Sequence, residues 1–198
     1  MNLTRNFFKL TFGALLLSTL CFVGCKKDNQ TSRLMIRMTD DPADYLEVNV
    51  DVQSVQISYS DNGSGGWTTL TTNAGVYDLL DLQNDVSVVI ADQAEIPVGR
   101  LNQLRLVLGQ NNTLVTTHGT YPLLLSSQDK TGLKINMNLD MPVDKYIDIL
   151  IDFDAGKSIV EEGNGQYRLK PVLRLEAVNF YELNDSIPLT TGGTTTTN

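Results

Sequence analysis

The chain has 198 residues, of which 41% are hydrophobic, so it is long enough to bury the core of about one domain. The first 25 residues contain Arg5 and Lys9 and no acid, whereas the rest carries 13 basic and 23 acidic groups, a net charge of about −10. An acidic domain repels phosphate backbones and anionic head groups, which argues against nucleic acid and anionic lipid surfaces as direct partners.

The first element expected in the chain is an export signal over residues 1–24. Arg5 and Lys9 provide a positive start, and an apolar run of about 14 residues follows from Leu10 to Val23. This run is short for a segment that must cross about 30 Å of hydrocarbon at about 1.5 Å per residue. We therefore expect a signal peptide that is removed, and not a permanent transmembrane helix.

The signal ends with an apolar residue, a tolerant position, a small residue and a cysteine, namely Phe22, Val23, Gly24 and Cys25. This order resembles the lipobox of bacterial lipoproteins, although leucine is usual where Phe22 stands. The resemblance implies that Cys25 is lipidated with acyl chains of the palmitate type, which anchor a protein at about 0.8 kcal/mol per buried CH₂. A plain signal peptide followed by an incidental cysteine is the alternative. The other cysteine, Cys21, lies within the signal, so the mature domain is expected to contain no disulfide.

Residues 25–32 comprise the lipidated cysteine and a polar stretch without apolar periodicity, which is typical of a tether. Lys26 follows the cysteine, and by resemblance to the sorting rule of Gram-negative lipoproteins the absence of Asp there implies the outer membrane. Lys27 and Asp28 resemble part of the charged surface-export tag of Bacteroidota lipoproteins. The sequence leaves a periplasmic and a cell-surface face equally open.

Beyond the tether the dominant hydrophobic period is two, which is typical of strands with one buried face. The alternation is clear in residues 33–38, 104–108, 133–139 and 147–153. In residues 47–60 the apolar phase shifts by one residue after Val52, so a bulge near Gln53 and Ser54 is expected to keep both halves facing the core. The segment 172–181 shows the same change, with Ala177 giving way to Val178 and Phe180.

Turn-forming residues separate these strands, at 61–66, 97–99, 110–112, 118–119 and 163–165. Short helical turns are expected at 78–82 and 155–160 as connectors. The pattern predicts one all-β domain over residues 33–184, an antiparallel β-sandwich of about nine strands. The Thr- and Gly-rich residues 185–198 cannot bury enough apolar surface to become ordered and are expected to form a disordered tail.

Several short motifs, taken together, are similar to those of the lipoproteins that carry domain of unknown function 4382. The motifs are Thr39-Asp40-Asp41-Pro42 with Tyr45, Tyr77-Asp78-Leu79-Leu80, Thr131-Gly132-Leu133-Lys134-Ile135, Asp152-Phe153-Asp154-Ala155 with Ser158-Ile159-Val160, and Leu169-Lys170-Pro171-Val172. The resemblance covers about residues 33–181. It implies an immunoglobulin-like or prealbumin-like β-sandwich and no established activity.

The sequence contains no recognisable catalytic constellation. Residues 154–158 end like a phosphate-binding loop, but Ile151 stands where the first glycine of that loop is needed, so a strand-exit turn capped by Asp154 or Ser158 is favoured. His118 is the only histidine, which excludes a histidine-based metal cluster, and any Ser-His-Asp triad would have to use it. It precedes Gly119 in an expected hairpin. We therefore predict a protein that is not an enzyme.

Two aromatic residues favour a binding role. Trp67 and Tyr59 flank the Gly-rich residues 61–66, and exposed aromatics beside a loop are a common means of stacking on sugars or proteins. The alternative is that Trp67 opens a strand and packs at the edge of the sandwich.

Three carboxylates lie within five positions directly after the first strand, at Asp40, Asp41 and Asp44. They are candidates for a calcium site, completed by carbonyls and by an acid from a neighbouring loop, such as Asp78 or Asp81. The alternative is that these residues only form the turn at Pro42 and accept backbone N–H bonds. Apart from calcium, no cofactor is expected.

The sequence thus predicts a lipid-anchored protein of the cell envelope with a non-enzymatic binding or structural role. An envelope glycan or protein is the expected class of partner, besides the membrane that Cys25 contacts through its lipid. The alternative is a glycan-active or calcium-dependent carbohydrate-binding accessory protein.

Overall fold

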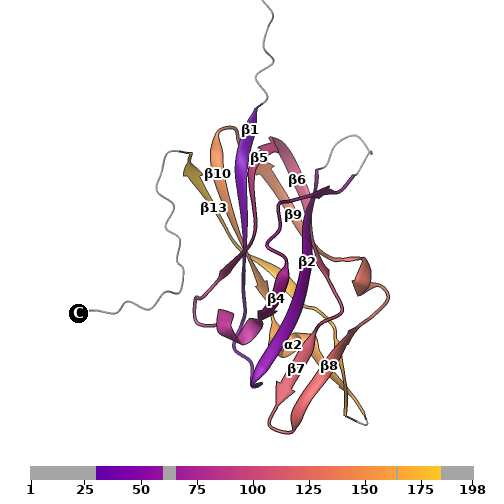
Figure 1. Cartoon of the computed structure of the whole chain (residues 1–198). Helices are drawn as coiled ribbons and strands as arrows, with labels where there is room; N and C mark the ends of the chain where they lie inside the picture. Colours follow the sequence, from indigo (N-terminus) through magenta and orange to yellow (C-terminus); the bar gives the residue numbers. More distant parts are fainter. Residues whose placement is uncertain (1–29, 60–65, 164, 184–198) are drawn as a thin grey trace, which may run out of the picture.

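The structure is a computed structural model that describes residues 30–59, 66–163 and 165–183. The all-β prediction is confirmed: two sheets face each other across one core (Figure 1). The expected signal peptide, Cys25, most of the 61–66 loop and the tail over 185–198 lie outside the described residues. Among the described residues, no helix is long and apolar enough to span a membrane.

The smaller sheet has four strands in the order β13-β10-β1-β5. Their bounds are β1 (Thr31–Thr39), β5 (Val88–Pro97), β10 (Lys145–Phe153) and β13 (Leu173–Glu182). The sheet is mixed, because most of its neighbours pair antiparallel, as expected, whereas β1 and β10 at its centre pair in parallel. Parallel neighbours need a long crossover connection, and here the crossover runs through most of the other sheet.

The larger sheet has nine strands, with β11-β12-β8-β7-β2-β6-β9 in order and two short strands, β3 and β4, paired to β2. Their bounds are β2 (Glu47–Tyr59), β3 (Thr68–Thr69), β4 (Gly75–Asp78), β6 (Gly99–Leu108), β7 (Thr113–Thr116), β8 (Gly119–Leu125), β9 (Leu133–Met141), β11 (Ile159–Glu162) and β12 (Gln166–Leu169). The described chain has more strands than the nine expected, because five of them have at most four residues and are too short to show alternation. Strands β8 and β12 are a second parallel pair.

Strand β2 contains the predicted bulge. Its register against β6 shifts between Val52 and Ser54, and the valines on both sides of the shift are fully buried. In β13 the register against β10 shifts at Glu176, one residue before the predicted phase change. Phe180, which the pattern placed on the core face, is 46% exposed because β13 is an edge strand.

The core lies between the inner faces of the two sheets. Fully buried aliphatic side chains from both sheets form it, among them Leu34, Ile36, Ile147, Ile149, Val55, Ile57, Leu104 and Leu106. Burial of each such side chain contributes about 1.5–3 kcal/mol, so this core is the main source of stability.

Three short helical segments connect strands: η1 (Leu79–Leu82), η2 (Asp129–Thr131) and α2 (Ala155–Ser158). The helical turn predicted at 78–82 is confirmed. The turn predicted at 155–160 is shorter than expected, because α2 ends at Ser158 and β11 begins at Ile159. Asp78 and Asp154 cap η1 and α2 by accepting bonds from Leu80 N and Lys157 N.

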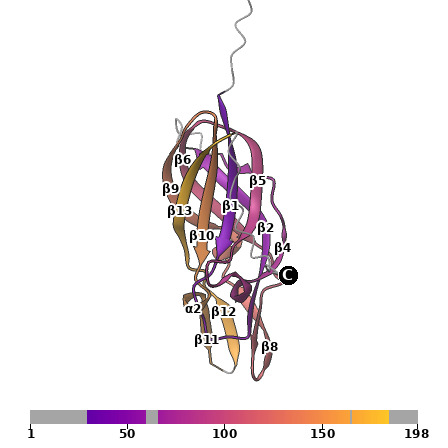
Figure 2. The same ribbon diagram turned by 90° about the vertical axis from the view of Figure 1, so that its left-hand side faces the viewer.

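Both ends of the described chain lie at the same end of the sandwich. Arg33 near the start of β1 pairs with Tyr146, which also pairs with Tyr181 near the end of β13. The loops that leave β1 and β10, and α2 after them, lie at the other end, as Figures 1 and 2 show. Strand β1 starts at Thr31, two residues before the predicted boundary, because Thr31 and Ser32 already pair with Pro97 and Ile96 of β5.

Candidate functional site

An acidic pocket of about 460 Å³ lies where β1 and β10 end, at the end of the sandwich away from the chain ends. It opens on the outer side of the four-stranded sheet. Its lining residues come from β1, β10, β13 and the turns beside them: Arg37, Thr39, Asp40, Asp41, Pro42, Asn84, Asp85, Ser87, Leu150, Asp152, Arg174 and Glu176.

The parallel pairing of β1 with β10 explains why acids gather in this pocket. Thr39 pairs with Asp152, so the two strands finish side by side and the residues that follow both strands converge. Asp40 and Asp41 follow β1, and Asp154 follows β10. Arg174 on β13 pairs with Asp152 in register and adds the opposite charge.

Asp40 links the loop after β1 to two other segments. It is 5% exposed, and its Oδ1 accepts a hydrogen bond from Ala155 N at 2.7 Å while Oδ2 accepts one from Gln83 Nε2 at 3.3 Å. Burial raises the pKa of Asp40 to about 6, because desolvation disfavours the charged carboxylate. Asp40 therefore has a structural role: it connects the loop after β1 to α2 and to the segment after η1.

Asp154 is held by α2, which it caps. Its Oδ1 accepts from Lys157 N at 2.9 Å, and its Oδ2 forms an ion pair with Lys157 Nζ. The Ser158 hydroxyl is fully buried; it donates to Asp154 O and accepts from Val172 N. The segment that ends like a phosphate-binding loop is thus a capped strand exit, as the favoured interpretation predicted.

Asp152 and Asp41 share the guanidinium of Arg174. Arg174 NH1 and NH2 each donate to Asp41 at 3.0 Å, and this bidentate bond lowers the pKa of Asp41. NH1 also lies 3.0 Å from Asp152 Oδ2, yet no hydrogen bond reaches that oxygen within the described part of the chain. Asp152 is 1% exposed, and burial raises its pKa to about 6.

This arrangement is suited to binding a cation. One oxygen each from Asp41, Asp152 and Asp154 lies within 4.8 Å of the other two. Five acids line the pocket, against Arg37 and Arg174, so negative charge is in excess. The acids are Asp40, Asp41, Asp85, Asp152 and Glu176. Asp154 and Lys157 lie beside the pocket and pair with each other. A metal ion would be held by the three clustered carboxylates, with Arg174 as the group it competes with.

The structure brings together only part of the acid set that the sequence suggested. Asp40 and Asp41 are at the pocket, but both oxygens of Asp40 already accept hydrogen bonds and Asp40 is not in the clustered group. Asp44 is exposed and outside the group. Asp78 caps η1 and accepts from Val48 N, and Asp81 is also outside the group.

Sequence reasoning missed Asp152 and Asp154 as candidate ligands. Both were visible as an Asp-x-Asp pair at the end of a strand. Their approach to Asp41 depends on the parallel pairing of β1 and β10, which the alternation of apolar residues does not indicate. Two acids at the end of an apolar strand were the available signal.

Trp67 and Tyr59 lie on opposite faces of the nine-stranded sheet. Tyr59 pairs with the fully buried Leu101 and packs against the core; its hydroxyl is buried without a described hydrogen-bond partner, and burial raises its pKa to about 12. Trp67 lies under the guanidinium of Arg105 on the outer face. The two aromatics therefore do not form one surface.

His118 lies in the exposed turn between β7 and β8. Its backbone N donates to Thr116 Oγ1 at 3.1 Å, and its ring Nδ1 is 3.3 Å from Thr117 Oγ1. It is not among the residues that line the acidic pocket.

Comparison with protein families agrees with the fold and the motifs. A family model described as domain of unknown function (DUF4382) matches residues 31–171. The chain belongs to this family. The match in this DUF4382 protein begins with β1 and includes Asp40, Asp41, Asp152 and Asp154, whereas Arg174 lies beyond it. No curated protein and no solved structure matches the chain.

Proposed function

We propose that this DUF4382 protein is a lipid-anchored envelope protein with a non-enzymatic binding role, and that its acidic pocket binds a divalent cation, calcium in the first place. The observation that carries the binding role is the clustering of carboxylate oxygens from Asp41, Asp152 and Asp154 within 4.8 Å. The proposed lipid anchor rests on the lipobox-like residues that end at Cys25. The proposed location in the outer membrane rests on Lys26, the residue that follows the cysteine.

The placement of the pocket supports a role away from the membrane. Five residues lie between Cys25 and Thr31, so the two are at most about 22 Å apart when the chain is extended. Strand β1 then runs nine residues, about 30 Å, to the acidic pocket. With the lipid on Cys25, the pocket faces away from the bilayer and is open to solutes.

The chemistry of the pocket suits calcium better than a softer metal. Calcium takes six to eight hard oxygen ligands at about 2.3–2.6 Å, and carboxylates are its usual protein ligands. Arg174 must release Asp41 and Asp152 when the ion binds. Loss of the Arg174–Asp41 ion pair costs little stability, because both side chains are more than 40% exposed. Ion pairs that are this exposed contribute at most about 1 kcal/mol.

Calorimetry on the full chain tests the cation site. Calcium chloride at millimolar concentration and pH 7.5 should give a heat of binding and raise the thermal midpoint, since a ligand of the folded state stabilises it. Asp152→Asn should abolish both effects. Asp44→Asn is the matched control, because Asp44 is exposed and outside the cluster, and it should bind as the parent does. Absence of both heat and a midpoint shift in the parent chain would disprove the site.

Metabolic labelling with a fatty-acid analogue tests the anchor. The parent chain and a Cys21→Ala control should take up the label, whereas Cys25→Ala should not, because only the Cys25 thiol can form the thioether that the lipobox implies. Undiminished label on Cys25→Ala would contradict the lipoprotein proposal. It would not affect the cation site, which calorimetry tests separately.

A further inference from the structure

Two positive side chains lie directly opposite each other on the outer face of the nine-stranded sheet. Arg105 on β6 pairs with Lys134 on β9 in antiparallel register. Like charges at such positions destabilise a sheet unless another group compensates them. Neither side chain forms an ion pair with an acid in the part of the chain that the structure describes, although the chain as a whole is acidic.

The indole ring of Trp67 lies against both cations. Arg105 Cζ is 3.8 Å from the ring centroid and Lys134 Nζ is 5.7 Å from it, which are cation–π distances. Trp67 therefore compensates part of the repulsion, but it has no negative charge.

The position of Arg105 is fixed by its neighbours. Its NH1 donates to Thr131 O at 3.1 Å, and its Nε is buried without a described hydrogen-bond partner. Gly132 has a φ of +107°, and a Cβ there would overlap Cγ and Cδ of Arg105. Because residue 132 is a glycine, the Arg105 side chain can pack against the Thr131–Gly132 turn. This contact and the bond to Thr131 O position the guanidinium without a ligand.

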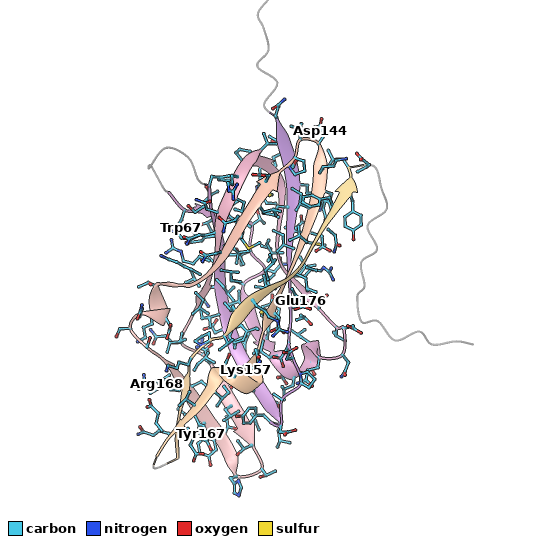
Figure 3. The ribbon with its side chains drawn as sticks, turned by 180° about the vertical axis from the view of Figure 1, so that it is seen from behind. Trp67, Asp144, Lys157, Tyr167, Arg168 and Glu176 are labelled. Atoms are coloured by element: carbon cyan, nitrogen blue, oxygen red, sulfur yellow. The ribbon has the colours of Figure 1, made fainter. Side chains whose placement is uncertain are left out.

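Planar amides continue this surface along the same two strands. Gln103 Nε2 donates to Asn136 Oδ1 at 2.9 Å. These two residues pair across β6 and β9, two positions along each strand from Arg105 and Lys134. We call Trp67, Arg105, Lys134, Gln103 and Asn136 the cationic patch. A second pocket of about 500 Å³ borders the patch. Lys134 belongs to both, and the pocket is also lined by Thr131 and Gly132, the turn that contacts Arg105. Figure 3 shows Trp67 well apart from Glu176, which lines the acidic pocket, and from Lys157, which pairs with Asp154 beside that pocket.

We propose that the cationic patch binds a carboxylate-bearing glycan. A carboxylate supplies the missing charge to Arg105 and Lys134, and the guanidinium offers it two parallel donors. The amides of Gln103 and Asn136 match the hydroxyl groups of a sugar, and the pocket beside Lys134 accommodates a neighbouring ring. The acidity of the rest of the domain works against nucleic acid, whose continuous phosphate backbone extends beyond a two-cation patch. This inference goes beyond the cation site and the anchor and depends on neither.

Trp67 is the only tryptophan of the chain, so its fluorescence reports on the patch directly. The full chain is titrated with an oligogalacturonate, and a saturable change in Trp67 emission is expected. A neutral galacto-oligosaccharide of equal length should give no change. Raising the salt concentration should weaken the oligogalacturonate response, because partly exposed charges are screened.

Substitutions on the same two strands separate this site from a general charge effect. Lys134→Gln, at an exposed position, should weaken binding at least about tenfold and leave the thermal midpoint unchanged. Arg105→Gln should weaken it further. Arg100→Gln is the matched control, because Arg100 lies on the same strand opposite Asp140, and it should bind as the parent does. Asp152→Asn should also bind as the parent does, so failure of the cation site leaves this test intact.

Three outcomes would overturn the proposal. The first is no change in Trp67 emission at millimolar oligogalacturonate. The second is an equal response to the neutral oligosaccharide, which would remove the role of the carboxylate. The third is an equal response to polyphosphate or to phosphatidylglycerol vesicles, which would make the patch a general anion or membrane surface.

Discussion

The guanidinium of Arg37 holds the carboxylate of Asp148 by two hydrogen bonds, from Nε to Oδ1 at 2.9 Å and from NH2 to Oδ2 at 2.6 Å. Only 14% of the Arg37 side chain and 3% of the Asp148 side chain are exposed. Ser87 Oγ accepts a third bond, from Arg37 NH1 at 2.9 Å. The four-stranded sheet thus has a buried ion pair on the face that points away from the hydrophobic core.

Loss of Arg37 should destabilise the fold strongly. Arg37→Met leaves the buried Asp148 carboxylate without a counter-charge, and breaking a buried pair in this way costs about 3–5 kcal/mol. Urea unfolding at pH 7 measures the loss. Arg33→Met is the control, since Arg33 pairs with Asp92 at a site that is 41% and 37% exposed, and it should cost no more than about 1 kcal/mol. Equal losses would show that burial of the Asp148 pair is unimportant.

The acidic pocket should make stability depend on pH between about 4 and 6. Asp40 and Asp152 have an ordinary pKa of 3.8 and a folded pKa of about 6. Between these values the folded state binds more protons than the unfolded state, so the contribution of both groups to stability falls as pH rises and is constant above the folded pKa.

Urea unfolding at pH 4.5 and pH 7 tests this prediction. A comparison of the parent with the double variant Asp40→Asn, Asp152→Asn separates the effect of these two carboxyls from that of other titrating groups. The double variant should lose less stability than the parent on going from pH 4.5 to pH 7. Identical pH slopes, or a steeper slope in the variant, would show that these two carboxyls are not the ones that titrate.

Asp51 should be needed for the turn between β6 and β7. It is 3% exposed, and its Oδ2 accepts from Asn111 N at 3.1 Å and from Asn111 Nδ2 at 3.0 Å. Asp51→Ala leaves these donors without their acceptor and should cost about 1–3 kcal/mol in urea unfolding. Asp44→Ala, on an exposed loop, should stay within about 0.5 kcal/mol of the parent. A comparable loss in both variants would contradict a special role for Asp51.

Deletion of residues 189–198 should leave the thermal midpoint unchanged within measurement scatter, since a Thr- and Gly-rich segment contributes little burial. A deletion that extends into β13, from residue 179 onward, should lower the midpoint, because β13 pairs with β10 as far as Glu182. A clear drop from the shorter deletion would show that the tail docks on the domain.

The features that could be predicted from the sequence are those encoded by neighbouring residues. The bulge in β2 follows from the phase change between Val52 and Val55, and the capped turn after Asp78 from local turn chemistry. Both depend on a few consecutive side chains, so no knowledge of the fold was needed.

The candidate site depended on pairings between distant residues. Asp152 alternates with apolar residues and was therefore assigned to a solvent-facing side, yet Arg174 and the loop after β1 bury it. Trp67 could be recognised as an aromatic beside a loop, but its partner Arg105 lies on another strand, and their contact follows from sheet order alone. Side-chain period indicates which face a residue occupies, and it does not indicate what covers that face.

The central position of β1 has a mechanical consequence. The strand is hydrogen-bonded to β10 on one side and to β5 on the other, and the proposed tether precedes it in the sequence. A pull on the proposed lipid anchor acts along the strand axis and shears both ladders at once, whereas a pull across the axis would break their bonds one at a time. A domain anchored in this way can hold a bound ligand against flow, because the force enters through a strand that is hydrogen-bonded on both sides.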